Sequence, residues 1–221
     1  MNYAERQVAD IAANLPGATQ VFRKHKIDFC CGGQVPLSEA VAARGEPIAA
    51  IEAELAALET DTAEAPQSSD ELIEHILERY HATHRAELPE LIRLAARVEA
   101  RHAENTLVPR GIHAALVEAA EALDEHMEKE EQILFPLMRA GGHPMIRHPI
   151  GRMRDEHDEH GERLANLQAL ANDFELPEEA CSTWRALYAG VRKLIDDVHE
   201  HVHLENNVLF ARFEAQRFEP Q

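Results

Sequence analysis

The chain has 221 residues, 45% of them apolar, with only 10 Gly and 11 Pro, a composition that favours helices over a many-stranded β fold. Its formal net charge of −18 would repel the phosphates of nucleic acids and anionic lipids, so neither is expected to bind. Three cysteines are too few for a disulfide framework and fit a reducing compartment.

The start of the chain lacks the pattern of a targeting segment. Charged residues stand at Glu5, Arg6 and Asp10, where a signal peptide would have an apolar core. No apolar run approaches the roughly 20 residues that cross a bilayer as a helix. We therefore expect a cytoplasmic protein with no membrane partner.

The first sixty residues are predicted to form short helices, with Pro16 and Pro47 in first-turn positions. The stretch from Thr60 to Ser69, TDTAEAPQSS, has no apolar periodicity and the composition of a linker. Such a linker would let the first domain move against the second without a fixed interface. The predicted division is a small helical cysteine-containing domain at 1–60, a linker at 61–69 and a second domain at 70–221.

Four long segments beyond the linker carry apolar residues at helical spacing and are separated by helix breakers. Asp70 is the predicted N-cap of the first. The segments run approximately from Asp70 to His102, from Pro109 to Ala140, from Pro149 past Leu167, and from Pro177 to Glu214. Four such helices with short connections predict an all-α fold with an antiparallel four-helix bundle.

Ionisable side chains interrupt the apolar stripe of every predicted bundle helix. A buried, unpaired carboxylate costs several kcal/mol or takes up a proton, so these groups need partners. A metal would supply one, because imidazole nitrogen and carboxylate oxygen are both metal ligands. The side chains concerned are His84, His126, Glu130, His157, His201 and Glu205.

Two of these helices share one spacing. His126 precedes Glu130, and His201 precedes Glu205, by four residues, which places imidazole and carboxylate on one helical face. The surrounding segments HMEKEEQILFP and HVHLENNVLFA align without gaps. One single-ligand helix and one two-ligand helix, each used twice, predict a pseudo-twofold site in which two metals receive two imidazoles each and share two carboxylates.

The donor set mixes nitrogen and oxygen without thiolate, which fits iron or manganese better than structural zinc. We predict two non-haem iron ions, with coordination positions open for an oxo or hydroxo bridge and a small ligand. The alternative is that the six residues only pair with each other at the edge of the core. Six residues on matched stripes with a duplicated spacing favour the metal site.

The other histidines are assigned differently. His81 and His160 each lie three residues from a predicted ligand, and we expect them behind the ligands rather than on the metal. Cys181 is expected to be structural. Most of the remaining histidines are expected on the surface, namely His75, His102, His113, His143, His148, His199 and His203.

The paired H-x3-E segments resemble those of hemerythrin-like domains, and nearly the whole chain resembles the iron–sulfur cluster repair di-iron family. The motifs are DFCCGG at 28–33, HRAELPEL at 84–91, HMEKEEQILFP at 126–136, EHDEHGE at 156–162 and HVHLENNVLF at 201–210. The resemblance implies a hemerythrin-like bundle whose iron ligands are the four histidines above, with Glu130 and Glu205 as bridges. His160 and His203 depart from the family pattern, where smaller residues are expected.

The resemblance also implies an N-terminal domain with vicinal cysteines, here Cys30 and Cys31. Adjacent cysteines close a strained ring when oxidised, so two thiols are expected at rest. The pair could hold iron or engage a damaged cluster on a client protein. The alternative is a small buried residue plus a turn before Gly32 and Gly33.

The function implied by the resemblance is repair of iron–sulfur clusters damaged by oxidative or nitrosative stress, with iron supplied from the di-iron centre. Two other classes stay open, a hemerythrin-like oxygen-binding or sensing protein and an enzyme that reduces nitric oxide or oxygen between the irons. The expected partners are damaged iron–sulfur proteins and these diatomic molecules. The sequence leaves a homodimer open.

Overall fold

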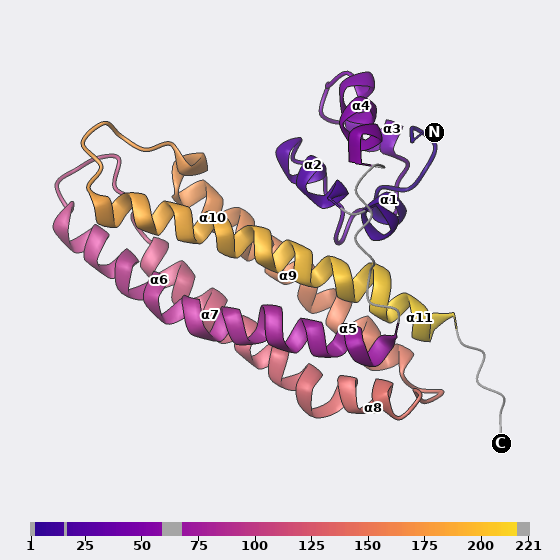
Figure 1. Ribbon diagram of the computed structural model, residues 1–221. Helices are drawn as coiled ribbons and strands as arrows, with labels where there is room; N and C mark the ends of the chain where they lie inside the picture. Colours follow the sequence, from indigo (N-terminus) through magenta and orange to yellow (C-terminus); the bar gives the residue numbers. More distant parts are fainter. Residues whose placement is uncertain (1–2, 16, 59–67, 216–221) are drawn as a thin grey trace.

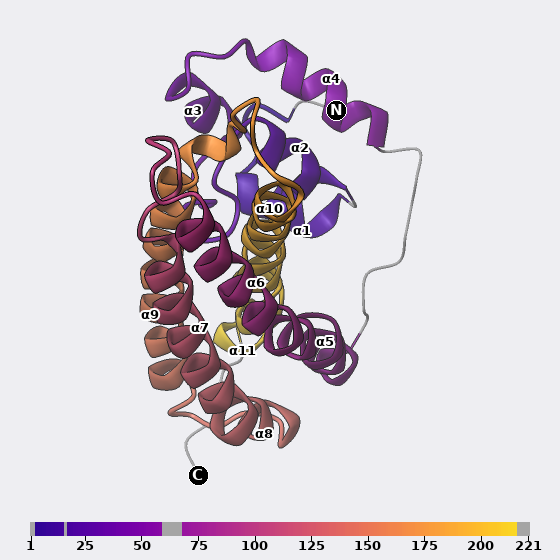
Figure 2. The same ribbon diagram turned by 90° about the vertical axis from the view of Figure 1, so that its left-hand side faces the viewer.

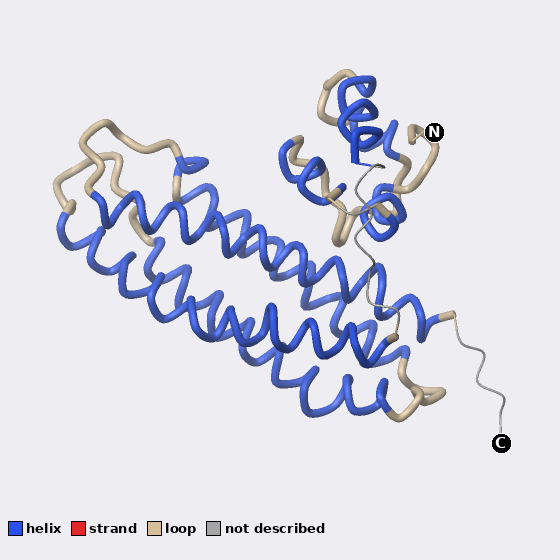
Figure 3. Tube along the Cα trace, viewed as in Figure 1, coloured by secondary structure: helices blue, strands red, loops and turns tan. Residues whose placement is uncertain are grey.

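The computed structural model of the protein describes residues 3–15, 17–58 and 68–215. These residues form helices and loops with no strand among them (Figure 3), which confirms the predicted all-α class. Short helices of the N-terminal unit, residues 3–58, lie against one side of a long helical bundle (Figure 1). Within the described ranges, no helix is both long enough and apolar enough to cross a membrane.

The N-terminal unit is built from short helices around a small apolar core. The helices are α1 Val8–Asn14, α2 Ala18–Lys24, α3 Leu37–Ala42 and α4 Ile48–Leu58. Phe22, Leu37 and Leu55 are fully buried. The predicted end of this unit at residue 60 and the predicted linker up to residue 67 lie outside the described residues.

The bundle consists of four columns that run side by side, as the end-on view shows (Figure 2). The columns are α5 Ser69–His75, η1 Ile76–His81 and α6 Ala82–Arg101; α7 Ile112–Lys129, η2 Glu130–Leu134 and α8 Phe135–Arg139; α9 Arg147–Leu170; and α10 Ser182–His203, η4 Leu204–Leu209 and α11 Phe210–Glu214. A 3-10 turn, η3 Asn172–Phe174, follows α9. The predicted four-helix bundle is present.

The first column begins with a capping box instead of at the predicted Asp70 N-cap. Ser68 is the N-cap: its hydroxyl accepts from the Glu71 N–H at 3.1 Å, and the Glu71 carboxylate accepts from the Ser68 N–H at 3.0 Å. This reciprocal pair satisfies two free amide groups, which a cap at Asp70 would not do. Asp70 lies in the first turn, where its charge favours the helix N-terminus.

Apolar side chains fill the bundle on both sides of its middle. One cluster includes Leu88, Leu123 and Val198, and another lies towards α8 and α11 and includes Ile76 and Phe210. In every column the histidines and glutamates singled out by the sequence fall between residues of these two clusters. The fold thus places the ionisable groups in a layer sealed on both sides by apolar packing.

Candidate metal centre

Eight buried histidine and glutamate side chains form a polar layer across the bundle. Each is at most 5% exposed. All six predicted ligands belong to it, together with the two histidines that were expected behind them. The members are His81, His84, His126, Glu130, His157, His160, His201 and Glu205.

Three columns change from α-helical to π-helical hydrogen bonding at this layer. Segment η1 ends at His81, η2 begins at Glu130, and η4 includes Glu205. A π segment has i to i+5 hydrogen bonds and often marks a functional site. It turns the side chains that follow it around the helix axis, so a stripe drawn on a uniform α-helix does not give their final directions.

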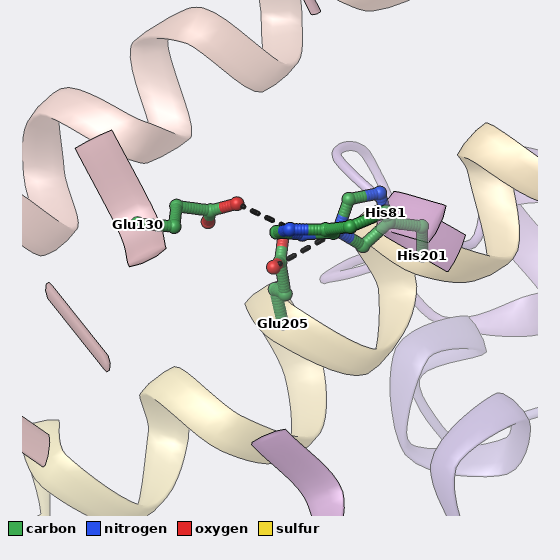
Figure 4. Close-up of side chains that lie close together, drawn as sticks. All are labelled: His81, Glu130, His201 and Glu205. Carbon is green, nitrogen blue, oxygen red and sulfur yellow. Dashed lines mark hydrogen bonds and ion pairs between the residues drawn. The ribbon is translucent and has the colours of Figure 1, made fainter. Parts of the chain in front are cut away.

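Two sets of side chains offer ligand atoms close enough to bind one ion each. The first set is His81, Glu130, His201 and Glu205 (Figure 4), and the second is His126, Glu130, His157 and Glu205. Within each set the ligand atoms lie within 4.8 Å of one another. Both glutamates belong to both sets, which is the pseudo-twofold pattern expected from the sequence, except that His81 takes the place of His84. That these residues bind metal stays a prediction.

The imidazoles of His126 and His157 present lone pairs to each other. The Nδ1 of His126 lies 2.9 Å from Glu156 Oε2, and the Nδ1 of His157 lies 2.9 Å from Asn206 Oδ1. Because both oxygens are acceptors, each Nδ1 carries a hydrogen, and each neutral ring has a free Nε2 lone pair. The two Nε2 atoms are 3.0 Å apart, which matches two ligands at right angles, each about 2.1 Å from a shared ion.

His81 and His201 repeat this arrangement in the first set. Their Nε2 atoms are 3.1 Å apart. On the other side of the ring, His81 Nδ1 lies 2.7 Å from Glu131 Oε1, which also accepts from Arg85 at 2.6 Å. A carboxylate behind an imidazole fixes the tautomer that binds metal through Nε2. His81 therefore has surroundings that also suit a ligand, and whether it binds metal or lies behind a ligand stays untested.

The two carboxyl groups of the layer, those of Glu130 and Glu205, have different surroundings. Glu205 is fully buried, with Oε1 3.0 Å from His201 Nε2 and Oε2 3.1 Å from His157 Nε2. Among the described residues, neither oxygen of the fully buried Glu130 accepts a hydrogen bond.

The pKa values of the two carboxyl groups are shifted in opposite directions. Burial, and then the negative charge of Glu205, raise the pKa of Glu130 well above its usual value. Burial also opposes ionisation of Glu205, but His201 and His157 hold its pKa well below the usual value. A shared dication would supply the positive charge that two ionised, buried carboxylates require.

The histidines of the layer are suited to metal binding at neutral pH. Burial lowers the pKa of His81 and His126 to about 4, and that of His84 and His160 to about 3. Each of these rings is therefore neutral at pH 7 and keeps a nitrogen lone pair. Metals bind the neutral ring, so protons do not compete in this pH range.

His84 and His160 are the two histidines of the layer outside both sets. Their Nε2 atoms are buried and have no hydrogen-bond partner in the part of the chain that the structure describes. The ring centroid of His84 lies 5.5 Å from that of His201, and that of His160 lies 4.9 Å from that of His126. A buried imidazole nitrogen without a partner costs stability, so His84 remains a candidate ligand. The H-x2-H spacing shared by 81–84 and 157–160 was the sequence signal for such neighbours.

Two histidines that were expected on the surface contact the N-terminal unit instead. His203 is 1% exposed, with Nδ1 3.3 Å from the Phe29 carbonyl oxygen. His199 is half-buried with its ring edge against Phe29. The expectation was wrong for His203 because it treated the bundle alone, whereas the N-terminal unit covers this face of α10. Of the rest, His75, His143 and His148 are exposed, and His102 and His113 are half-buried.

The cysteines lie in a loop, residues 28–33 and called here the cysteine loop, that is organised by the Asp28 carboxylate. Asp28 accepts from the backbone N–H groups of Cys30, Cys31 and Gly32 at 3.0, 3.2 and 2.9 Å. The thiol of the buried Cys30 lies 3.4 Å from Asp28 Oδ1. The neighbouring Cys31 and burial raise the pKa of Cys30 far above its usual value. Cys31 is half-buried, and both are free thiols.

The cysteine loop is docked on the bundle in this structure, whereas the linker composition predicts only that the first domain is able to move. Asn207 Nδ2 donates to the carbonyl oxygens of Phe29 and Cys30 at 3.0 and 3.2 Å. Arg23 of α2 forms an ion pair with Glu200 of α10 at 2.8 Å. These contacts hold the thiols next to the polar layer.

A cleft of about 1240 Å³ lies between the N-terminal unit and the bundle and is lined by both cysteines. Basic side chains enter it from both walls, although the chain as a whole is strongly acidic. They are Arg23, Lys24, Lys26, Arg44 and Arg192. The carboxylates Asp28, Asp158, Glu162, Asp173 and Asp196 also line it. Both thiols therefore border a cleft of mixed charge.

Cys181 lies away from this region, at the N-cap of α10, with its Sγ 3.2 Å from His102 Nε2. Burial acts to raise its pKa, but the backbone N–H groups of Trp184 and Thr183 and the His102 ring lower it to about 7. The expectation that Cys181 is only structural is not tested by these contacts.

Comparison with known proteins gives a family for each part of the chain. A family model described as the hemerythrin HHE cation binding domain matches residues 72–213, and one described as a domain of unknown function, DUF542, matches residues 4–59. Proteins named iron-sulfur cluster repair protein YtfE from Escherichia coli O157:H7 and from Escherichia fergusonii are each 45% identical over 217 residues. Each alignment covers 96% of this chain and 98% of the relative.

Proposed function

This chain belongs to the iron–sulfur cluster repair family and carries the hemerythrin cation-binding domain, and from that premise we propose that it restores damaged iron–sulfur clusters by donating iron from its polar layer. The observation that carries the proposal is the pair of ligand sets that share Glu130 and Glu205. Shared carboxylates between two imidazole pairs form a site for two ions in one buried layer.

The proposed ligands are the six residues predicted from the sequence, joined by His81. They are His81, His84, His126, Glu130, His157, His201 and Glu205. A donor set of imidazoles and carboxylates without thiolate suits iron. When bound, two non-haem iron ions with an oxo or hydroxo bridge would supply redox chemistry and a store of iron that an acceptor can take up.

The protein's own residues keep the ligands ready to bind. Lys129 and Arg152 each lie 2.8 Å from Glu156 Oε1. His126 and then Lys129 hold the pKa of Glu156 at about 2, so the carboxylate stays charged and keeps the hydrogen on His126 Nδ1. The lone pair of His126 Nε2 then faces the site at neutral pH. This arrangement favours tight binding, and iron release therefore requires a competing acceptor.

We place the client at the cleft. Cys31 is the more exposed of the two thiols there, while Cys30 is buried and held as a thiol beside Asp28. Iron–sulfur clusters held by thiolates carry negative charge, and the five basic side chains of the cleft offset its five carboxylates, so the lining does not add to the repulsion expected from the acidic chain as a whole. Cys31 could then bind iron at the damaged corner of a cluster, since thiolate is a soft ligand.

The test is stoichiometric transfer of iron under anaerobic conditions. Iron-loaded protein is mixed with a protein whose exposed four-iron cluster has been damaged by nitric oxide, and both the iron moved and the recovered activity are measured. We expect recovery in proportion to the iron lost from the donor, and none with a Glu205→Gln variant that lacks iron. Catalytic consumption of nitric oxide with a reductant, without iron loss or client recovery, would instead favour a reductase.

A further inference from the structure

Asn206 is the one described side chain that bonds both a proposed metal ligand and the cysteine loop. It is 4% exposed. Its Oδ1 lies 2.9 Å from His157 Nδ1, and its Nδ2 lies 3.3 Å from the Cys30 carbonyl oxygen and 3.9 Å from Cys31 Sγ. A single amide group thus joins two segments that are about 175 residues apart in sequence.

The direction of this amide is fixed by chemistry. A backbone carbonyl oxygen can only accept, so the Asn206 NH₂ must face Cys30, and the amide oxygen must face His157. That oxygen can only accept, so His157 Nδ1 must carry the hydrogen. The His157 Nε2 lone pair is then free and faces the site, 3.0 Å from His126 Nε2 and 3.1 Å from Glu205 Oε2. The docked cysteine loop therefore selects the metal-binding tautomer of His157.

Metal binding should in turn affect the contact between Asn206 and the cysteine loop. A metal on His157 Nε2 requires the hydrogen on Nδ1, which keeps the amide oxygen towards His157 and the NH₂ towards the loop. Without metal, the ring is free to place its hydrogen on Nε2, which would favour a flipped amide. The flipped amide would set its oxygen against the Cys30 carbonyl oxygen, and two acceptors repel each other.

We propose that Asn206 couples metal occupancy of the bundle to the docking of the cysteine loop, so that a loaded centre holds the loop closed and an emptied centre loosens it. The inference rests on the proposed metal site and adds regulation to it. Coupling between two sites is reciprocal, so whatever displaces the loop must also weaken retention of the metal. A client that engages the thiols would thereby promote the release of iron.

Neighbouring Asn207 supplies a matched control. It donates to the Phe29 and Cys30 carbonyl oxygens at 3.0 and 3.2 Å, and to no proposed metal ligand. Asn207→Leu should loosen the loop in both metal states without removing the response to metal. Asn206→Asp should keep an acceptor for His157 and so retain metal, but it presents no N–H to Cys30. Asn206→Leu removes both contacts at similar volume.

The experiment is hydrogen exchange at the backbone amides of Cys30, Cys31 and Gly32, measured on full-length protein with and without two equivalents of Fe²⁺ under anaerobic conditions. Metal content is determined first on every sample. These amides bond Asp28 inside the loop, so their exchange reports its opening. Amides at the start of α10, at the distant end of that helix, serve as the internal reference.

In the parent we expect Fe²⁺ to slow exchange in the loop by about fivefold or more, the lower end of usual coupling between sites. The slowing should persist in Asn207→Leu and vanish in Asn206→Asp and Asn206→Leu. If the parent binds iron and its loop does not respond, or if Asn206→Asp responds like the parent, the coupling is overturned while the proposed function stands. A parent that binds no iron overturns both.

A second experiment measures the reciprocal effect, namely how displacement of the cysteine loop changes the rate of iron release. A Cβ at Gly33 would lie 2.8 Å from the Phe29 carbonyl oxygen and 2.9 Å from Ala9 Cβ, so Gly33→Ala must displace the loop. We expect Gly33→Ala to speed the release of iron to a chelator by about fivefold, and expect no such acceleration when Asn206 is already Asp. Equal release rates from parent and Gly33→Ala would overturn the coupling.

Discussion

Glu130 and Glu205 approach each other from two different columns of the bundle, and each offers a carboxylate oxygen to both potential metal sets. Both side chains are fully buried. Such a pair repels when ionised, and in the part of the chain that the structure describes no hydrogen bond to Glu130 offsets the cost of burying it there.

Loss of either carboxylate should therefore affect both ions. We expect Glu130→Gln and Glu205→Gln to lower iron affinity by more than about tenfold and the iron content from two ions towards none. The measurement is metal analysis after dialysis against a weak chelator. His148→Gln, on an exposed residue, is the control. Iron content that falls equally in the control would remove the reason for assigning the bridge.

The second prediction concerns the two histidines at the end of η1 and the start of α6. His81 belongs to the first ligand set, and His84 has a buried, unpartnered Nε2 beside it. We expect His81→Leu and His84→Leu each to lower iron content, with the second ion of the site retained better than in the glutamate variants. Circular dichroism checks that each variant folds. A variant that keeps two irons identifies its histidine as a non-ligand.

The third prediction is a pH dependence of the metal-free protein. Buried His160 has a pKa of about 3, against 6.5 when exposed. Between these values the unfolded chain binds a proton that the folded chain does not, so this residue's contribution to stability falls as pH drops below 6.5. We expect the unfolding free energy in urea to decrease between pH 6.5 and 4, and His160→Phe to reduce the slope by about 1.4 kcal/mol per pH unit.

The same scan contains an opposing contribution. The raised pKa of Glu130 means that the folded chain binds an extra proton, so the cost of burying this carboxyl grows as pH rises above 4.5. Comparison of His160→Phe with the parent isolates the histidine, because Glu130 is present in both. Parallel stability curves for the two proteins would show that burial does not suppress protonation of His160.

The fourth prediction separates the cysteine pair from iron storage. We expect the Cys30→Ser, Cys31→Ser double variant to retain its iron and its near-ultraviolet absorption, because neither thiol belongs to a ligand set in the described residues. Cluster restoration should fall, since the thiols that line the cleft are gone. Full restoration by the double variant would make the pair structural, and loss of iron would place a thiol among the ligands.

The sequence by itself determined the helical class, the bundle and the two His–Glu pairs. Spacing of four residues within one helix is a local property, so His126 with Glu130 and His201 with Glu205 share a face whatever the rest of the chain does. The buried positions of His84 and His157 followed similarly, because apolar periodicity marks the face of a helix that meets the core.

Only the tertiary structure decided which neighbours these groups have. His81 ends a π segment and belongs to the first ligand set. The sequence did not predict this position, because a change of hydrogen-bond register is not visible in an apolar stripe. The burial of His203 and the bond from Asn206 to the cysteine loop depend on how two distant parts of the chain dock. Such contacts are set by the matching of two surfaces, and a single helix carries the pattern of only one of them.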